Sequence, residues 1–116
     1  MKRIYLVSPY SGTKKQQIER FESACRIAGK VIKQGHCVFS PISHSHFIAL
    51  LGGIQGTHEF WKAQNESWLE WSDELWVAKM PGWEDSKGVK WEMAWAVMNY
   101  RPVEFIDPVS GRKDVI

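Results

Sequence analysis

The carboxylate of Glu92 is the group in this chain that is best placed to do chemistry. Glu92 follows a polar loop over residues 80–88, and an apolar run at 74–78 precedes that loop. A strand, a loop and a helix in this order form ligand-binding turns at the carboxyl edge of parallel sheets. A carboxylate held there can attack an electrophilic carbon as a nucleophile. The alternative is a surface carboxylate paired with Lys87 or Lys90, and composition alone favours that alternative.

Two other loops contribute hydroxyls and imidazoles. Residues 8–12, Ser-Pro-Tyr-Ser-Gly, offer hydroxyls and backbone N–H groups before a helix start, where the dipole favours an anion. A plain turn is equally compatible with that sequence. The segment lacks the motifs of a P-loop and of a dinucleotide site. His44 and His46 are expected to hydrogen-bond a ligand or to cap a helix. Because they lack a supporting carboxylate and an i,i+4 spacing, we predict no metal, and no cofactor either.

The tryptophans are compatible with more than one role, and there are seven of them in 116 residues. Trp91 and Trp95 share a helical face, which is typical of core packing. Tryptophan faces left exposed on the later helices would instead promote association. Trp83 differs because it lies in a loop, beside Gly82. A flat ring at the mouth of a crevice suits stacking on a nucleobase.

Alternating strands and helices are predicted to position these groups. We expect strands at residues 3–8, 36–40, 74–79 and 103–106, and helices at 14–34, 43–51, 57–71 and 87–100. In the first helix, apolar residues recur at spacings of three and four. Strands separated by helices pair in parallel through right-handed crossovers. The predicted fold is therefore α/β, a three-layer flavodoxin-like or Rossmann-like sandwich with a parallel sheet of four strands, or five if the tail adds one. The loops at 8–13, 40–46 and 80–88 then share one edge of the sheet.

Length and composition favour a single domain over residues 1–116. The net charge of +2 is too small to indicate a nucleic-acid surface. No apolar run approaches the roughly 18 residues of a membrane span, and the first one is too short for a signal peptide. Cys25 and Cys37 lack metal-type spacing, which favours two reduced thiols in a cytoplasmic protein.

Four motifs occur in order along the chain: Ile4-Tyr-Leu-Val-Ser-Pro, Ser40-Pro, Trp68-Leu-x-x-x-Asp73 and Ser86-x-Gly-Val-x-x-Glu92. Together they resemble the nucleoside 2-deoxyribosyltransferase superfamily, which includes N-glycosidases of deoxynucleoside 5′-monophosphates. Residues 81–89 are also similar to short proteins of unassigned function placed near that superfamily. The resemblance spans residues 3–106, and its most specific part is 86–92.

The resemblance implies a flavodoxin-like fold, homo-oligomers whose subunits complete each other's sites, and cleavage of the bond between a base and 2-deoxyribose. Glu92 matches the nucleophilic Glu of the family, and Tyr5 matches a Tyr whose hydroxyl positions it. Ser8 and Ser86 match serines that bind the phosphate in the hydrolytic branch. The remaining candidates for substrate binding are Tyr10, Ser40, His44, His46, Trp83, Asp85 and Gly88.

Asn65 departs from the family pattern, which places an Asp eight residues before the position of Asp73. In relatives this Asp contacts the sugar hydroxyls and helps with proton transfer. An Asn still hydrogen-bonds a hydroxyl but does not donate a proton as an acid. Proton transfer contributes about 10²–10⁴-fold to the rate. Turnover is therefore reduced, or the base leaves without help, or another group supplies the proton, with Glu66, Asp85 and His44 as candidates.

Three functions are compatible with these residues. The first is an N-glycosidase or deoxyribosyltransferase acting on a nucleoside or its 5′-monophosphate, with Glu92 as the nucleophile. The second is a non-catalytic nucleotide sensor, which Asn65 favours. The third is a metal-dependent hydrolase using His44, His46 and His58, which the spacing disfavours. We prefer the first, with a small molecule as the partner rather than a nucleic acid or a membrane.

Overall fold

The computed structural model describes residues 1–114 and contains the predicted strands and helices in the predicted order. These elements are β1 (Arg3–Val7), α1 (Lys14–Lys33), β2 (Cys37–Phe39), α2 (Pro41–Leu51), α3 (His58–Trp71), β3 (Glu74–Ala78), the short 3-10 helix η1 (Trp83–Asp85), α4 (Lys87–Met98) and β4 (Val103–Ile106).

The four strands form one parallel sheet in the order β2-β1-β3-β4. β1 is central, since Tyr5 pairs with Phe39 of β2 on one side and with Leu75 of β3 on the other. The strands are added first to one side of β1 and then to the other. The loops after β1 and β3 therefore lead to opposite faces of the sheet, and ligands of such folds bind in the crevice between them.

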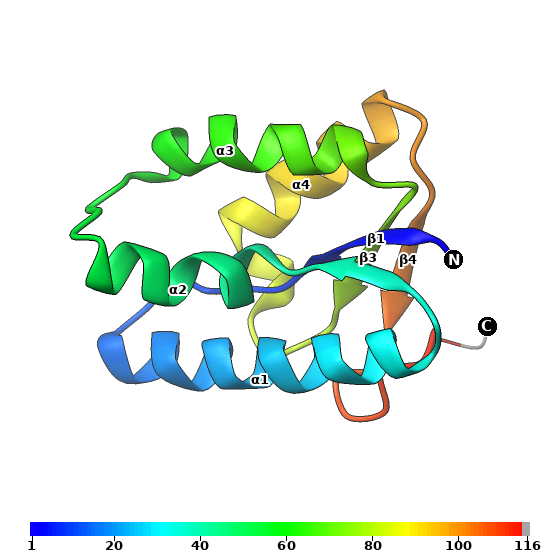
Figure 1. Cartoon of the computed structure of the whole chain (residues 1–116), viewed down its shortest axis with the longest axis horizontal. Helices are drawn as coiled ribbons and strands as arrows, with labels where there is room; N and C mark the ends of the chain where they lie inside the picture. Colours follow the sequence, from blue (N-terminus) through cyan, green and yellow to red (C-terminus); the bar gives the residue numbers. More distant parts are fainter. Residues whose placement is uncertain (115–116) are drawn as a thin grey trace.

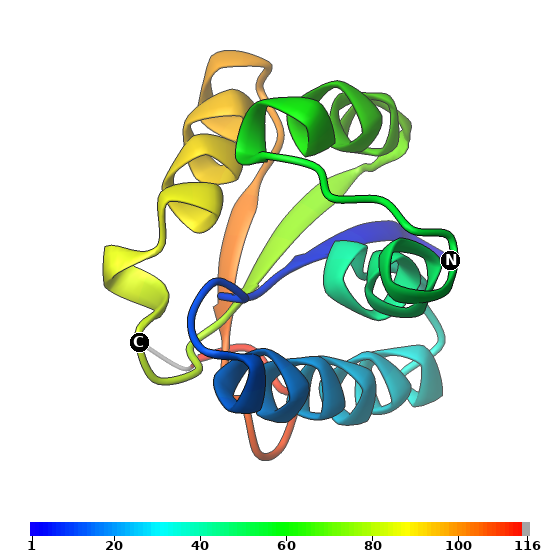
Figure 2. The ribbon, with the colours of Figure 1, turned by 90° about the vertical axis from the view of Figure 1, so that its left-hand side faces the viewer.

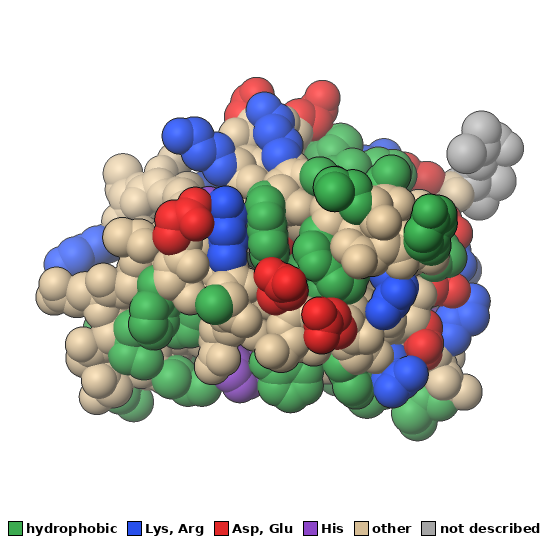
Figure 3. All heavy atoms as spheres, turned by 90° about the horizontal axis from the view of Figure 1, so that it is seen from above, with side chains coloured by type: hydrophobic (Ala, Val, Ile, Leu, Met, Phe, Trp, Pro, Cys, Tyr) green, Lys and Arg blue, Asp and Glu red, His purple; other side chains and the backbone are tan. Residues whose placement is uncertain are grey.

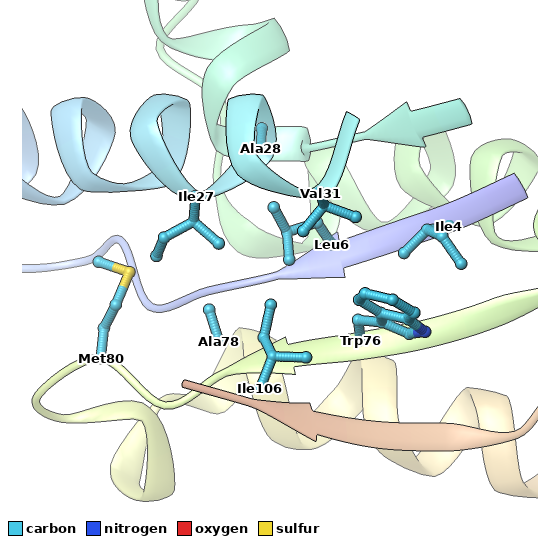
Figure 4. Close-up of a cluster of buried hydrophobic side chains, with 9 residues drawn as sticks. All are labelled: Ile4, Leu6, Ile27, Ala28, Val31, Trp76, Ala78, Met80 and Ile106. Atoms are coloured by element: carbon cyan, nitrogen blue, oxygen red, sulfur yellow. The ribbon is translucent and has the colours of Figure 1, made fainter. Parts of the chain in front are cut away.

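The sheet lies between two layers of helices. Figure 1 shows α1 on one side of it and α3 with α4 on the other, and Figure 2 shows the same layers from the end. This is the three-layer parallel arrangement that the sequence predicts. The α1 face of the sheet carries the buried cluster drawn in Figure 4, in which alternate residues of β1 and β3 meet the apolar stripe of α1. The members of this cluster are Ile4, Leu6, Ile27, Ala28, Val31, Trp76, Ala78, Met80 and Ile106.

The opposite face of the sheet determines where the chemistry lies. Tyr5 and Val7 of β1 point to this face and pack with Leu69 of α3 and Val89 of α4. Side chains alternate along a strand, so Tyr5 must face away from α1 if Ile4 and Leu6 face toward it. Tyr5 is thereby directed to the layer that contains α4.

The segment after β2 is helical, which corrects the prediction of a loop at residues 40–46. Ser40 caps α2, because its hydroxyl accepts a hydrogen bond from the Ser43 N–H at 3.3 Å. Pro41 lies in the first turn of the helix, where its missing N–H has no consequence. The helix therefore begins two residues earlier than predicted, and His44 and His46 lie on it rather than on a loop.

The C-terminal segment adds no fifth strand within residues 1–114. Lys113 makes only an isolated antiparallel bridge with Ile106. Gln34 Nε2 donates to the Gly111 carbonyl at 2.7 Å, so the segment packs against the end of α1. Residues 115–116, part of the predicted tail, lie outside the described residues. The helix before β4 ends at Met98, earlier than predicted.

Within the part of the chain described here, no helix combines the length and the apolar character that crossing a membrane requires. Cys25 and Cys37 are both free. On the face that α3 presents, acidic, basic and apolar side chains are interspersed (Figure 3). That mixture is consistent with the near balance of charges in the sequence.

Candidate active site

A pocket of about 340 Å³ opens at the carboxyl edge of the sheet. Its walls come from the loop after β1, from α2 and α3, and from the first turns of α4. Parallel α/β sheets bind their ligands at this edge, and the volume lies in the range of small-molecule sites. The lining includes seven of the predicted site residues: Ser8, Tyr10, His46, Asn65, Ser86, Gly88 and Glu92.

The Glu92 carboxyl is buried in this pocket. Only 7% of the residue is exposed, and Oε2 has no hydrogen-bond partner within residues 1–114. Burial raises the pKa of Glu92 to about 7, and the neighbouring Tyr5 hydroxyl partly opposes that rise. The ion pairs among the described residues do not include Glu92. The alternative of a solvated carboxylate paired with Lys87 or Lys90 is therefore excluded.

Tyr5 approaches Glu92 from β1. The side chain is fully buried, and this burial, with the charge of Glu92 as a lesser cause, raises the pKa of Tyr5 well above its usual value of 10.0. The hydroxyl has no hydrogen-bond partner within residues 1–114. Tyr5 does not line the pocket itself but lies behind Glu92. A neutral hydroxyl in that position is a donor that can orient the carboxylate.

Polar atoms without partners converge on this pocket. Within residues 1–114, several buried side-chain atoms have no hydrogen-bond partner. Four of them lie at the pocket or in its wall: the Tyr5 hydroxyl, Ser8 Oγ, Asn65 Oδ1 and Glu92 Oε2. Each such atom costs about 1–3 kcal/mol, and such atoms are rare in folded proteins. Their concentration in one place indicates a ligand that presents several hydrogen-bonding groups.

The N-terminus of α4 forms one side of the pocket. Ser86 caps the helix, its Oγ accepting a hydrogen bond from the Val89 N–H at 3.3 Å. Gly88 leaves open space next to Ser86. A β-carbon added at position 88 would lie 3.9 Å from its nearest atoms, which are Glu92 Oε1, Ser86 Oγ and His58 Cε1. A ligand can therefore reach the carboxylate and the positive end of the helix together.

Two lysines line the pocket, and one of them also forms an ion pair. Lys62 of α3 holds its Nζ 5.4 Å from the centre of the Trp91 ring and 2.9 Å from Glu59 Oε1. Lys87 lies at the start of α4, and both lysines line the pocket. Among the lining residues, Glu92 is the only acid. This balance suits an anionic ligand.

Aromatic side chains gather on the opposite side. The Tyr10 hydroxyl and His46 Nδ1 share a hydrogen bond of 2.8 Å, and burial raises the pKa of Tyr10. The His46 ring stacks on Phe21 of α1, with ring centres 4.3 Å apart and planes 20° apart. The pocket continues here into a groove lined by Phe47 and Trp61, among others. This side of the pocket is therefore suited to a flat, apolar group.

Four predicted binding residues lie outside the pocket lining. The Ser40 hydroxyl is used within α2, where it caps the helix and donates to Ser43 Oγ at 2.9 Å. His44 is exposed on the far side of α2 from the lining residues, with its ring near Phe39 and Trp68.

Trp83 and Asp85 are the other two, and both lie in η1. The Trp83 ring packs on Phe105 of β4 at 5.4 Å and adjoins the core on the α4 side of the sheet. The interpretation of Trp83 as a ring that stacks on a base at the mouth of the crevice is therefore wrong. Asp85 is exposed to solvent. Gly82, which precedes η1, has φ 89°, a left-handed conformation that glycine adopts readily.

The three histidines considered as metal ligands do not come together. Within residues 1–114, no three side chains of His, Cys, Asp or Glu are close enough to one another to hold a metal ion. His46 and His58 both line the pocket, but they come from α2 and α3, and His44 does not join them.

Several lining residues were not identified from the sequence, notably Trp61, Lys62 and Trp91. The tryptophans were interpreted as core or association residues because they recur at helical spacing. A signal was nevertheless present on α3. Trp61 and Lys62 precede Asn65 by four and three residues, so they share its helix face.

Comparisons with known proteins identify a family and a similar fold. Residues 2–107 match a protein family described as a domain of unknown function, DUF1937. No curated protein matches the sequence. Among solved structures, a 2-deoxyribosyltransferase from the psychrotolerant bacterium Bacillus psychrosaccharolyticus matches over 98% of this chain and 76% of its own, with a TM-score of 0.65 and 21% identity. That enzyme is described as a biocatalyst for the synthesis of nucleosides. The match confirms the predicted fold.

Proposed function

We propose a function from the premise that the chain belongs to the DUF1937 family and has the fold of a 2-deoxyribosyltransferase. The protein cleaves the bond between base and sugar in a (deoxy)nucleoside or its 5′-monophosphate, as an N-glycosidase or a deoxyribosyltransferase. The observation that carries this proposal is the buried, unpartnered Oε2 of Glu92 beside the Tyr5 hydroxyl, in a pocket of small-molecule size.

Glu92 acts as the nucleophile in this reaction. Its carboxylate attacks the anomeric carbon, the base departs, and water or a second base then releases the sugar. A pKa of about 7 allows a substantial fraction of Glu92 to be ionised at neutral pH. The Tyr5 hydroxyl holds the attacking oxygen, and the unpartnered Asn65 Oδ1 accepts a hydrogen bond from a sugar hydroxyl.

The cations of the pocket favour a 5′-monophosphate over an uncharged nucleoside. Lys62, Lys87 and the capped start of α4 all border the space in front of Glu92. From the loop after β1, Ser8 adds a buried hydroxyl that has no hydrogen-bond partner within residues 1–114. Backbone N–H groups at a helix start together with lysines are a common arrangement for binding phosphate.

The proposal is tested by incubating the protein with deoxynucleosides and their 5′-monophosphates, with and without a second base, and measuring free or exchanged base by chromatography. Release or exchange by the native protein that disappears in Glu92→Gln supports the proposal. Glu92→Gln keeps the shape of the side chain and removes its charge, so loss of activity with a melting temperature that is unchanged or higher is specific. Absence of release from every compound contradicts it.

A nucleotide sensor without turnover is the second candidate, because Asn65 occupies the position of the family Asp. Such a protein would be stabilised by a nucleotide that it never consumes, which a thermal-shift screen followed by chromatography detects. Restoring the acid in Asn65→Asp distinguishes the two functions. Appearance of hydrolysis in the variant alone would identify a pocket that has lost its proton donor.

We also propose that the protein associates with itself through α2. The tryptophans of α3 and α4 that were expected to be exposed are half-buried. The exposed apolar side chains are instead concentrated on α2, and they are Phe47, Ile48, Leu50 and Leu51. An exposed apolar surface of this kind marks an interaction site. Light scattering after size exclusion tests this, with Leu50→Lys expected to yield monomers and a persistent oligomer contradicting the assignment.

A nucleotide substrate and two free thiols fit the cytoplasmic location predicted from the sequence.

A further inference from the structure

We propose that His46, held in place by Tyr10, is the acid that protonates the departing base. This inference rests on the N-glycosidase function proposed above. It assigns the proton donor that the change to Asn65 leaves open.

The groups considered from the sequence as replacements for that acid do not line the pocket. Glu66, Asp85 and His44 are all exposed and lie outside its lining. The titratable groups that do line it, apart from Glu92, are Tyr10, His46, His58, Lys62 and Lys87. An efficient general acid has a pKa near the working pH, which favours a histidine over a tyrosine or a lysine. The choice is therefore between two histidines.

His46 is the histidine that is held in a defined orientation. Tyr10 binds its Nδ1 at 2.8 Å, and Phe21 stacks on one face of its ring. His58 is exposed at the first turn of α3 and meets the Trp91 ring edge-on at 6.3 Å. A general acid must be within hydrogen-bond reach of a defined atom, which requires a ring that is held.

The hydrogen bond to Tyr10 leaves Nε2 as the nitrogen of His46 that can serve a ligand. A tyrosine hydroxyl both donates and accepts, so it can stabilise His46 before and after proton loss. In the imidazolium, Nδ1–H donates to the Tyr10 oxygen and Nε2–H is free to donate. After transfer, the neutral ring keeps Nδ1–H and the same bond. Tyr10 is in this sense a positioning residue.

The aromatic surroundings place the base on the His46 side of the pocket. Phe21, Phe47 and Trp61 border the groove that begins at Tyr10 and His46. Phe21 and Phe47 come from α1 and α2, whereas the lysines come from α3 and the start of α4. A nucleotide with its phosphate near Lys87 and its base on the aromatic side spans the pocket with its sugar at Glu92.

The reaction balances with these groups. In the first step a bond forms between Glu92 and the anomeric carbon, and the carbon–nitrogen bond breaks with its electron pair passing to the base. The Nε2 proton of His46 transfers to a nitrogen or oxygen of that base. In the second step water attacks the anomeric carbon, His46 takes the proton of that water, and the Glu92 carboxylate is released.

The test compares two leaving groups in His46→Gln. One substrate is the best deoxynucleotide of the panel, whose base needs a proton to leave. The other is 7-methyl-2′-deoxyguanosine 5′-monophosphate, whose base already carries the positive charge that protonation would create. We expect His46→Gln to slow base release from the first substrate by about 10²–10⁴-fold and to leave the rate of release from the second nearly unchanged. Glu92→Gln should abolish both reactions, since the nucleophile is needed for either.

Tyr10→Phe provides a second variant with less disturbance of the fold. This substitution keeps the aromatic ring of residue 10 and removes its hydrogen bond to His46 Nδ1. It should therefore slow base release from the first substrate selectively, and by a smaller factor than His46→Gln does. Equal slowing of both substrates by His46→Gln and by Tyr10→Phe would overturn the inference and indicate a structural role. A native protein that cleaves only the charged base would also overturn it, while leaving the role of Glu92 intact. Cleavage of neither substrate would instead reject the proposed function.

Discussion

The Tyr5 hydroxyl on β1 lies beside the Glu92 carboxyl on α4, and both groups are buried with atoms that have no hydrogen-bond partner within residues 1–114. Two polar groups from different layers of the fold are thus held close together without satisfying each other fully. A core built for stability alone would avoid this arrangement.

The raised pKa of Glu92 predicts that stability depends on pH. The folded state keeps its proton up to about pH 7, whereas the unfolded carboxyl loses it near pH 4.5. Below pH 4.5 both states are protonated, so the contribution of Glu92 is fully present there and is lost as pH rises to about 7. Over this range the free energy of unfolding falls by on the order of 3 kcal/mol. Urea unfolding at pH 5 and pH 8 measures it, and Glu92→Gln should remove most of the difference. A pH dependence that survives in Glu92→Gln would assign the effect to other groups.

Tyr5→Phe should raise the pKa of Glu92 further, because the hydroxyl opposes the effect of burial. The rising limb of the pH–rate profile should move to higher pH, since only ionised Glu92 attacks. At pH 5, where Glu92 is protonated, the free energy of unfolding should change little or increase, because the lost hydroxyl has no hydrogen-bond partner within residues 1–114. A pH–rate profile of the variant checks the first effect and urea unfolding checks the second. A lower activity with no shift of the rising limb of the pH–rate profile would mean that Tyr5 acts on the substrate and not on Glu92.

Gly88→Ala should separate stability from activity. Position 88 is helical, its φ is outside the left-handed region, and the added β-carbon would meet no atom closer than 3.9 Å. Alanine in place of glycine within a helix stabilises by roughly 0.5–1 kcal/mol. The new methyl group would occupy the space beside Glu92 Oε1, so substrate binding should weaken. Thermal melting together with KM measurements tests both effects, and an unchanged KM would argue that the substrate lies elsewhere.

Lys62→Met should raise the KM for a deoxynucleoside 5′-monophosphate by roughly 10- to 100-fold, the value of a charged hydrogen bond. The KM for the matching nucleoside should change much less. Lys90→Met is the matched control, because Lys90 is an exposed lysine of α4 outside the pocket. If both substrates respond equally to Lys62→Met, the lysine does not bind the phosphate.

Much of the fold follows from local patterns in the sequence. The apolar runs of β1 and β3 and the helical periodicity of α1 predict a parallel α/β sheet. That topology brings the segments after β1 and β3 to one edge, which is why Ser8 and Glu92 line the same pocket. The start of α2 was predicted less well, because a proline after a strand has the same local signature whether it ends that strand or opens the next helix.

The sequence by itself therefore determined the layers, the parallel pairing of the strands and the edge at which the loops meet, because these depend on the alternation of polar and apolar residues within each element. Only the tertiary structure decided which side chains meet there. Trp83 and Trp91 look alike as aromatic residues beside acidic ones, yet one packs on Phe105 and the other lines the pocket under Lys62. Likewise His44 and His46 are two residues apart, and only His46 is oriented toward Tyr10. The physical reason is that a pocket forms where several elements meet without filling the space between them, and this depends on how whole elements pack rather than on any residue within one of them.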